Sequence, residues 1–301
     1  MSATVTDELP SALELAAAAP SPAGWWRHRS LVFGGAVLLV VVLVAIFAPL
    51  LAPHDPYVQN LTRRTIPPVW FAKGEWAHPL GTDALGRDYL SRTLYGARIS
   101  LLIGISVALL SGLIGTVLGV AAGYFGGKVD LAVTFAITVR LALPVILVAL
   151  AAVAIVGGSL PLVILVLGVL KWDRFVVVMR SATQSVRNLD YVTAARAGGA
   201  STARIIAREV LPNVAPFLIV TATLEAASAI LLEAALSFLG LGVQPPLPSW
   251  GLMISEAKPY MFFSFWLIAI PGGCLAFLIL AINLLGDGLR DAISPDRRSA
   301  S

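Results

Sequence analysis

The chain is poor in the residues that build catalytic and metal sites. Its 301 residues include one cysteine, Cys274, and three histidines, His28, His54 and His78. A single cysteine excludes a disulfide within the chain, and no group of His, Asp and Glu has the spacing of a metal-binding motif. The histidines lie outside the long apolar runs, so a hydrolase site within a membrane would lack its base. We therefore expect a non-catalytic protein that binds no metal.

Charge is scarce as well, and this decides the fold class. Charged residues make up 13% of the chain and apolar residues 58%, and the mean hydropathy is +0.87. Soluble domains carry about 25% charged residues, so we predict an all-α membrane protein. Runs of about 20 apolar residues are long enough to cross a bilayer as helices. Six transmembrane helices are predicted, at 31–52, 99–122, 131–156, 160–179, 215–237 and 264–285. The fourth run contains Lys171, Asp173 and Arg174, so its last turns are expected at the cytoplasmic interface.

The basic residues indicate an orientation. The formal net charge is +4. With the N-terminus inside, more Lys and Arg residues fall on the cytoplasmic side than on the opposite side, which favours cytoplasmic N- and C-termini. This distribution accounts for the positive charge without a nucleic-acid partner.

The composition divides the chain into four parts. Residues 1–26 are rich in Ala, Ser and Pro and predict a disordered cytoplasmic tail. Residues 27–98 predict a first membrane helix, too long for a cleaved signal and therefore retained, followed by an extracytoplasmic segment. Residues 99–290 predict a five-helix core with a short cytoplasmic helix at 190–201, and residues 291–301 predict a cytoplasmic tail.

The extracytoplasmic segment ends in a charged pattern that predicts an amphipathic helix. Thr82 or Asp83 can cap a helix whose leucines lie on one side, with Arg87, Asp88 and Arg92 largely on the other. We expect this helix to lie along the outer membrane surface and to lead into the second span. A short helix packed on neighbouring protein is the alternative.

A glycine-rich turn at 123–130 contains Gly127-Lys128, the pair that ends a phosphate-binding P-loop. That motif requires Gly where Ala122 stands and Ser or Thr where Val129 stands. The chain therefore lacks a P-loop, and any ATP that energises it is bound by another polypeptide.

Residues 190–212 predict a polar module of two short helices between membrane spans. Asp190 can cap the first helix, Gly198-Gly199 can end it, and Ser201 can cap the second, which Pro212 would close. Such a helical elbow is suited to binding a soluble partner, and an ordinary charged loop is the alternative.

The Pro- and Gly-rich stretch 239–263 is too apolar for a free loop. We expect it to fold back against the bundle, with Trp250 at interfacial depth.

Three ionisable residues lie within the predicted spans: Arg140, Glu225 and Glu233. Each costs about 2.5–3.5 kcal/mol at the centre of a bilayer, so they are expected to face the bundle interior or water. The two glutamates are about 80° apart around a helix, roughly on one side. Either the three residues line a solute pathway, or they are structural. In the structural case Arg140 pairs with Glu225, or Glu233 anchors the outer loop through backbone hydrogen bonds.

Five stretches resemble the peptide/nickel branch of ABC-importer permeases, in particular the C-type subunit of dipeptide and oligopeptide systems. They are residues 78–104, 123–130, 191–213, 233–251 and 286–291, in the family's order and spacing. Thr193-Ala194-Ala195, Gly199 and Leu211-Pro212 occupy the positions of the family's EAA loop, although Thr193 stands where the family usually has Glu. Glu233 falls in a family pattern, whereas Arg140 and Glu225 are peculiar to this chain.

The resemblance implies a type I ABC importer permease (MetI-like) fold in a bacterial cell membrane, importing di- or oligopeptides. Nickel, glutathione, opines or haem are alternative solutes. An ion-driven secondary transporter is less favoured because the chain shows no convincing internal repeat.

The resemblance also implies partners in the lipid bilayer and on both sides of it. These are a homologous B-type permease, two ABC ATPase subunits that hold ATP and Mg, and an extracytoplasmic substrate-binding protein. The residues implied to couple the chain to an ATPase are Thr193, Ala194, Ala195, Arg196, Gly199, Ala200, Ser201, Leu211 and Pro212.

Overall fold

The computed structural model describes residues 29–293, which form helices and connecting loops without a β-strand. The tail predicted at 1–26, and the part of the other predicted tail beyond residue 293, lie outside the described residues. The helices are α2 (Arg29–Leu51), α3 (Tyr89–Phe125), α4 (Gly127–Ala142), α5 (Val145–Val156), α6 (Leu160–Leu170), α7 (Asp173–Val186), α8 (Asp190–Ala197), α9 (Thr202–Ile205), α10 (Leu211–Phe238), α11 (Trp250–Ala257) and α12 (Trp266–Ile293). A π-helical turn, η3 (Ile206–Val210), joins α9 to α10 without a break.

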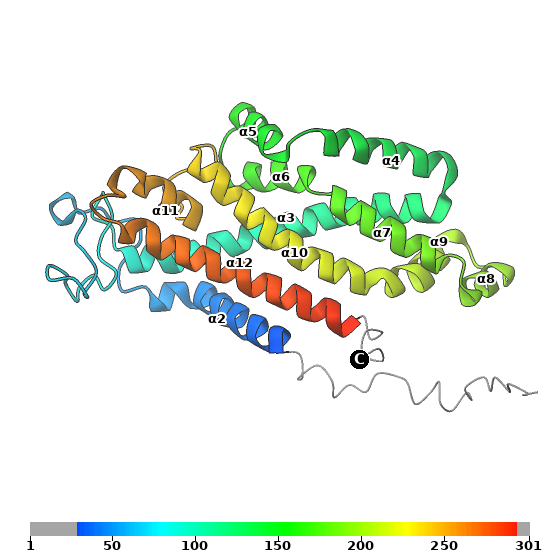
Figure 1. Ribbon diagram of the computed structural model, residues 1–301, viewed down its shortest axis with the longest axis horizontal. Helices are drawn as coiled ribbons and strands as arrows, with labels where there is room; N and C mark the ends of the chain where they lie inside the picture. The colour runs from blue at the N-terminus through cyan, green and yellow to red at the C-terminus, as the bar shows by residue number, and fades with distance from the viewer. Residues whose placement is uncertain (1–28, 294–301) are drawn as a thin grey trace, which may run out of the picture.

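The long helices lie side by side in an elongated bundle (Figure 1). Helix α3 packs along α7, α10, α2 and α6, and α12 packs along α2 and α10. Residues 52–88 and α11 lie at one end of the bundle, and α8 and α9 lie at the other (Figure 1). We call residues 190–205, which include α8 and α9, the elbow. The start of α2 and the end of α12 both point toward the elbow end.

Four helices are long and apolar enough to cross a membrane: α2, α3, α12 and the continuous helix from Thr202 to Phe238. The third predicted span is instead two helices, α4 and α5, bent by 85°. The fourth is also divided, because α6 has only 11 residues and ends before Lys171. Of the six predicted transmembrane helices, four are therefore single helices long enough to cross a membrane, a fifth is a bent pair, and the fourth in chain order is divided into two shorter helices.

Proline explains the first of these breaks. Leu143 precedes Pro144 and adopts an extended backbone, with φ −103° and ψ 127°, because the proline ring disfavours a helical residue before it. Pro144 then occupies the N-cap position of α5.

A row of glycines on α3 lets α7 approach closely. A Cβ added to Gly115 would lie 2.3 Å from Cβ of Phe175 and 2.8 Å from the carbonyl oxygen of Trp172. One added to Gly119 would lie 2.8 Å from Cβ of Met179, and one added to Gly123 would lie 2.7 Å from the carbonyl oxygen of Arg180. The four-residue spacing is the small-residue pattern of close helix packing in membranes.

The predicted surface helix starting at Thr82 or Asp83 is wrong. Helix α3 starts at Tyr89, and Asp88 is its N-cap, accepting a hydrogen bond from the backbone N–H of Ser91. The helix then continues for 37 residues into the bundle, so no separate surface helix exists in this part of the chain.

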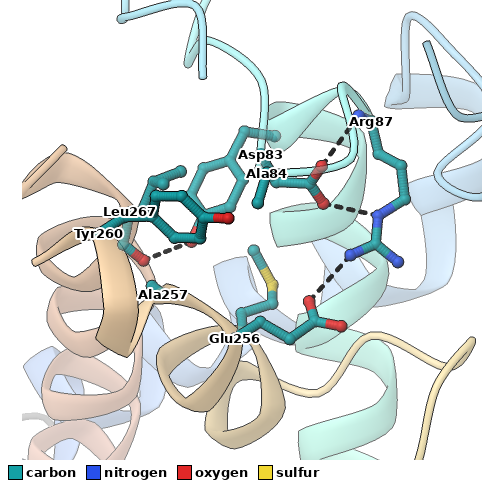
Figure 2. Close-up of a pocket in the computed structure, with 9 residues that line it drawn as sticks. Asp83, Ala84, Arg87, Glu256, Ala257, Tyr260 and Leu267 are labelled. Carbon is teal, nitrogen blue, oxygen red and sulfur yellow. Dashed lines mark hydrogen bonds and ion pairs between the residues drawn. The ribbon is translucent and has the colours of Figure 1, made fainter. Parts of the chain in front are cut away.

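The charges assigned to the solvent side of that helix are in fact buried. Arg87 donates to Asp83 at 2.6 Å and to Glu256 of α11 at 2.9 Å, and Figure 2 shows both carboxylates pointing toward its guanidinium. Arg92 is fully buried, 2.8 Å from Glu256 and 3.4 Å from Asp83. Beside these ion pairs is a cavity of about 20 Å³, close to the minimum for one water molecule. Two cations and two carboxylates thus fasten residues 83–92 to α11.

Three metal-ligating side chains come together at this end although their sequence spacing shows no motif. The ligand atoms of His54, His78 and Asp88 all lie within 4.8 Å of one another. The carboxylate of Asp88 is already engaged, because one oxygen is 2.8 Å from Nδ1 of His78 and the other accepts hydrogen bonds from Ser91. We interpret the group as the anchor of the α3 N-terminus, and the prediction that the chain binds no metal stays a prediction.

The glycine row gives a prediction. Gly115→Ala should lower the free energy of unfolding by about 1–3 kcal/mol, because the added methyl group meets backbone and a Cβ atom that cannot rotate away. Gly272→Ala is the matched control, since a Cβ at Gly272 meets no atom within 4 Å among the described residues. Thermal unfolding of the purified protein in detergent measures both, and equal melting temperatures for the two variants would contradict the packing interpretation.

Candidate functional site

Near the middle of the bundle, the break between α4 and α5 lies beside the break between α6 and α7, and Arg140 connects the two. Its Nε donates to the carbonyl oxygen of Leu170, the last residue of α6, at 2.7 Å. Its guanidinium also lies 3.5 Å from the carboxylate of Asp173, the first residue of α7. Arg140 therefore satisfies a carbonyl that the end of α6 leaves free, and it pairs with the acidic residue that starts the next helix.

Glu225 of α10 lies beside the same breaks. It is 1% exposed, and its Oε2 is 2.7 Å from Nζ of Lys171, which also donates to Ser228 at 2.8 Å. Its Oε1 lies 3.2 Å from the guanidinium of Arg174 but accepts no hydrogen bond among the described residues. The predicted pairing of Arg140 with Glu225 is wrong, because Arg140 is committed to α6 and α7 while the end of α6 directs Lys171 toward α10.

A cavity of about 280 Å³ lies beside these charges between α7 and α10, with Leu141 of α4 on a third side. Asp173, Arg174 and Glu225 contribute its charged groups, Thr221 contributes a hydroxyl, and the other lining residues are valines and leucines. Glu225 is the fifteenth residue of the 28-residue α10, which places it about 21 Å along a helix of about 42 Å. The cavity therefore lies at mid-length of the bundle, where a bilayer would be most apolar.

Glu233 belongs to a different site. It is 1% exposed and accepts hydrogen bonds from the hydroxyls of Ser237 at 2.6 Å and Ser249 at 3.1 Å, and from the backbone N–H of Val243. These contacts tie α10 to the loop before α11, which is the structural alternative considered for this residue. Among the three ionisable residues predicted within spans, Glu225 lines the cavity and Arg140 pairs with the lining residue Asp173, whereas Glu233 does neither.

The loop held by Glu233 folds back on the bundle as predicted, with Val243 1% exposed. Trp250 is buried within the protein, and its predicted interfacial depth stays a prediction. Its indole N–H donates to the carbonyl oxygen of Thr93 at 2.9 Å, and its ring packs where Gly96 leaves room on α3.

The elbow has the predicted order of helix, glycine and helix, with two differences. Gly198 is the C-cap of α8, Gly199 has φ +80°, and the hydroxyl of Ser201 caps α9. Asp190 is the first residue of α8 rather than its cap. Pro212 does not close the second helix, because α9 continues through η3 into α10. Proline has no N–H to donate to the preceding turn, and the ladder changes to the π-helical register in η3 directly before it.

The elbow packs against the bundle through one face and exposes the other. Val192 and Ile205 are buried against Val120 and Met179 in one apolar cluster. Ala194, Arg196 and Gly199 are exposed, while Ala195 and Ala200 are half-buried. The arginine lies over the ring of Tyr124 at 5.9 Å. A firmly seated helix pair thus leaves small side chains exposed on its outer face.

Comparisons with known proteins cover nearly the whole chain. A family described as "Binding-protein-dependent transport system inner membrane component" matches residues 115–299. A second family, described as the N-terminal TM domain of oligopeptide transport permease C, matches residues 25–68.

Individual relatives extend these matches. The chain is 43% identical over 287 residues to the di/tripeptide transport system permease protein DppC of Pseudomonas aeruginosa, covering 94% of this chain and 95% of the relative. It is 44% identical to the dipeptide transport system permease protein DppC of Escherichia coli K12, over 89% of this chain and 90% of the relative. The DppC of Bacillus subtilis is 38% identical over 90% of this chain and 83% of its own length.

The Lys171–Glu225 pair gives a second prediction. Lys171→Met or Glu225→Met alone should lower the free energy of unfolding by about 3–5 kcal/mol. The first leaves the buried Glu225 with only the exposed Arg174 as a counter-ion, and the second leaves the buried Lys171 without one. The double variant should lose far less than the sum, since an apolar pair replaces an ion pair. Thermal unfolding in detergent of the four proteins completes the cycle, and additive losses would mean that the two residues are not coupled.

Proposed function

Because this chain belongs to the family of binding-protein-dependent transport system inner membrane components, we propose that it is a permease subunit for the import of di- and tripeptides. The observation that carries the proposal is the similarity over 94% of the chain to a relative named as a di/tripeptide permease. Such a subunit forms part of a channel and performs no chemistry, in keeping with the shortage of catalytic groups.

The proposed arrangement is a type I importer fold with six crossings. The four long helices count as one crossing each, and the broken pairs α4–α5 and α6–α7 count as one each. The elbow, the N-terminus and the C-terminus lie in the cytoplasm, and residues 52–88 with α11 lie outside the cell membrane. The placement of the start of α2 and the end of α12 toward the elbow end supports this orientation (Figure 1).

The proposed solute pathway runs past the cavity between α7 and α10. The side chain of Arg174 is 68% exposed at mid-length of the bundle. An arginine facing lipid at that depth costs at least about 2.5–3.5 kcal/mol, so we place this face against water and a homologous B-type permease. Arg140 and Glu225 then belong to the wall of the pathway, and Glu233 supports the wall from the outer loop.

The elbow is the proposed contact with one of two ABC ATPase subunits, which bind ATP and Mg. Its small residues, including Ala194, Ala195 and Gly199, fit a groove because they permit close approach. The binding protein docks at the opposite end. ATP binding then shifts the two permeases between inward-open and outward-open states through its preference for one of them. The continuous helix from Thr202 to Phe238 connects the elbow to the pathway.

Reconstitution tests the function. The chain, its partner permease, both ATPases and the binding protein in proteoliposomes should accumulate a radiolabelled dipeptide only when ATP is supplied. Complexes whose ATPases bind but do not hydrolyse ATP serve as the control. Accumulation by this chain without ATPases would instead support an ion-driven transporter, and no accumulation of any di- or tripeptide would reject the peptide assignment.

The elbow gives a further prediction. Ala194→Trp should reduce ATP-driven uptake at least about 10-fold, because a bulky side chain on the exposed face of α8 prevents close docking. The residue is exposed, so the melting temperature should stay unchanged. Ala194→Ser is the matched control and should transport normally. Wild-type uptake by the tryptophan variant would show that this face does not contact an ATPase.

A further inference from the structure

The charged groups at the helix breaks do not balance. Arg140, Lys171 and Arg174 supply three positive charges, whereas Asp173 and Glu225 supply two negative ones. Arg140 pairs with Asp173, and Lys171 lies 2.7 Å from Glu225. Arg174 is therefore the cation left over, giving the group a net charge of +1.

Arg174 is also the one of the three cations whose side chain donates no hydrogen bond to any described residue, although it is ion-paired with Glu225. Its guanidinium lies 3.2 Å from Oε1 of Glu225, yet no hydrogen bond joins them, and that buried oxygen accepts none from any described residue. The other two cations are committed, Arg140 to the carbonyl oxygen of Leu170 and Lys171 to Ser228. Arg174 has a planar fork of donors that matches a carboxylate, and its side chain is 68% exposed.

The guanidinium of Arg174 lies at a cavity that a solute can enter. Arg174, Asp173 and Glu225 line the cavity of about 280 Å³, whose remaining walls are mostly apolar side chains of α7 and α10. Arg174 is the second residue of α7, so the unpaired N–H groups of that helix start add partial positive charge on the same side. Glu225, whose side chain is 1% exposed, also lines this cavity, and its Oε1 holds the guanidinium near it at 3.2 Å.

We propose that Arg174 binds the C-terminal carboxylate of a peptide in transit, with Glu225 as the positioning residue and the apolar cavity receiving the last side chain. This inference rests on the proposed function and names a substrate group for it. Only one cationic side chain of this group, Arg174, is proposed to bind the carboxylate, and no ring of several donors surrounds it among the described residues. The site therefore holds a carboxylate weakly enough for release, as a transport site must.

The test compares a dipeptide with its C-terminal amide in the reconstituted complex. Uptake of both is measured for wild type and for Arg174→Gln, at concentrations that saturate the binding protein. The ratio of acid uptake to amide uptake is taken for each permease, and the wild-type ratio is divided by that of the variant. Any preference of the binding protein for the acid cancels in this division, because the same binding protein is used with both permeases. We expect Arg174→Gln to reduce uptake of the acid at least about 10-fold, as for a lost charge-assisted hydrogen bond, and to leave the amide unchanged.

Matched variants separate this role from a general loss of charge. Lys128→Gln removes the same charge from the exposed first turn of α4, outside the cavity, and should change the uptake of neither peptide. Arg174→Lys keeps the charge but loses the fork, and it should lie between wild type and Arg174→Gln. The melting temperature and basal ATPase rate of each complex establish that it is assembled.

The other possible uptake results contradict either the role of Arg174 or the proposed peptide-import function. Equal losses for acid and amide, or no loss for either, would mean that Arg174 does not recognise the carboxylate, while peptide import by wild type would still stand. Failure of wild type to import any dipeptide would remove the proposed function itself. Should the binding protein reject the amide, a dipeptide ending in β-alanine replaces it, because its carboxylate is shifted by one carbon.

Discussion

A polypeptide that breaks its helices inside an apolar bundle must restore the lost backbone hydrogen bonds with side chains, because no bulk water is present to do so. Here that requirement falls on the junction between α6 and α7. The carbonyl oxygen of Leu170 is satisfied by Arg140 from α4, and the start of α7 carries Asp173 as a counter-ion for the same arginine. Arg140, whose positive charge satisfies this carbonyl, in turn requires a negatively charged residue nearby to neutralise it. The polar group at mid-length of the bundle thus follows from the broken helices, and the cavity beside it inherits those charges.

The opposite arrangement holds at the end formed by residues 52–88. There Arg87 and Arg92 are matched by Asp83 and Glu256, the first three residues are buried, Glu256 is 28% exposed, and the cavity beside them is about 20 Å³. This charge-balanced cluster fixes α11 to the start of α3. The group at mid-length carries one excess positive charge beside a cavity of about 280 Å³. Charge balance and cavity size, rather than the identity of the residues, are the reasons to give the first cluster a structural role and to propose solute binding at the second.

Much of the architecture was predictable from apolar runs, because burying a long hydrophobic helix depends mainly on its length and composition. Helices α2, α3, α10 and α12 follow from that signal, and the glycine and serine positions predicted the shape of the elbow. Lys171, Asp173 and Arg174 drew attention to the fourth run, but their partners lie on α4 and α10, so spacing could not name them. The same reason explains the error at Arg92. From the sequence alone, a charged residue on one face of a helix is predicted to be solvent-exposed. Arg92 is buried because it pairs with Glu256, which lies more than 160 residues away in the chain. Pro144 was visible in the sequence, although the size of the bend that it causes was not.

The uninterrupted helix from Thr202 to Phe238 has a mechanical consequence. The elbow lies at its start, Glu225 about two thirds of the way along it and Glu233 close to its end, so one helix carries the proposed ATPase contact, the cavity wall and the outer-loop anchor. The π-helical turn η3 and Pro216 lie between the elbow and Glu225, and they are the places where this helix can bend. From Glu225 to Glu233 the helix has no such irregularity, so a rotation that passes Pro216 reaches the cavity wall and the outer-loop anchor together. The ion pair of Lys171 with Glu225 joins the break between α6 and α7 to this helix, so a movement of α10 against that break would stretch the pair.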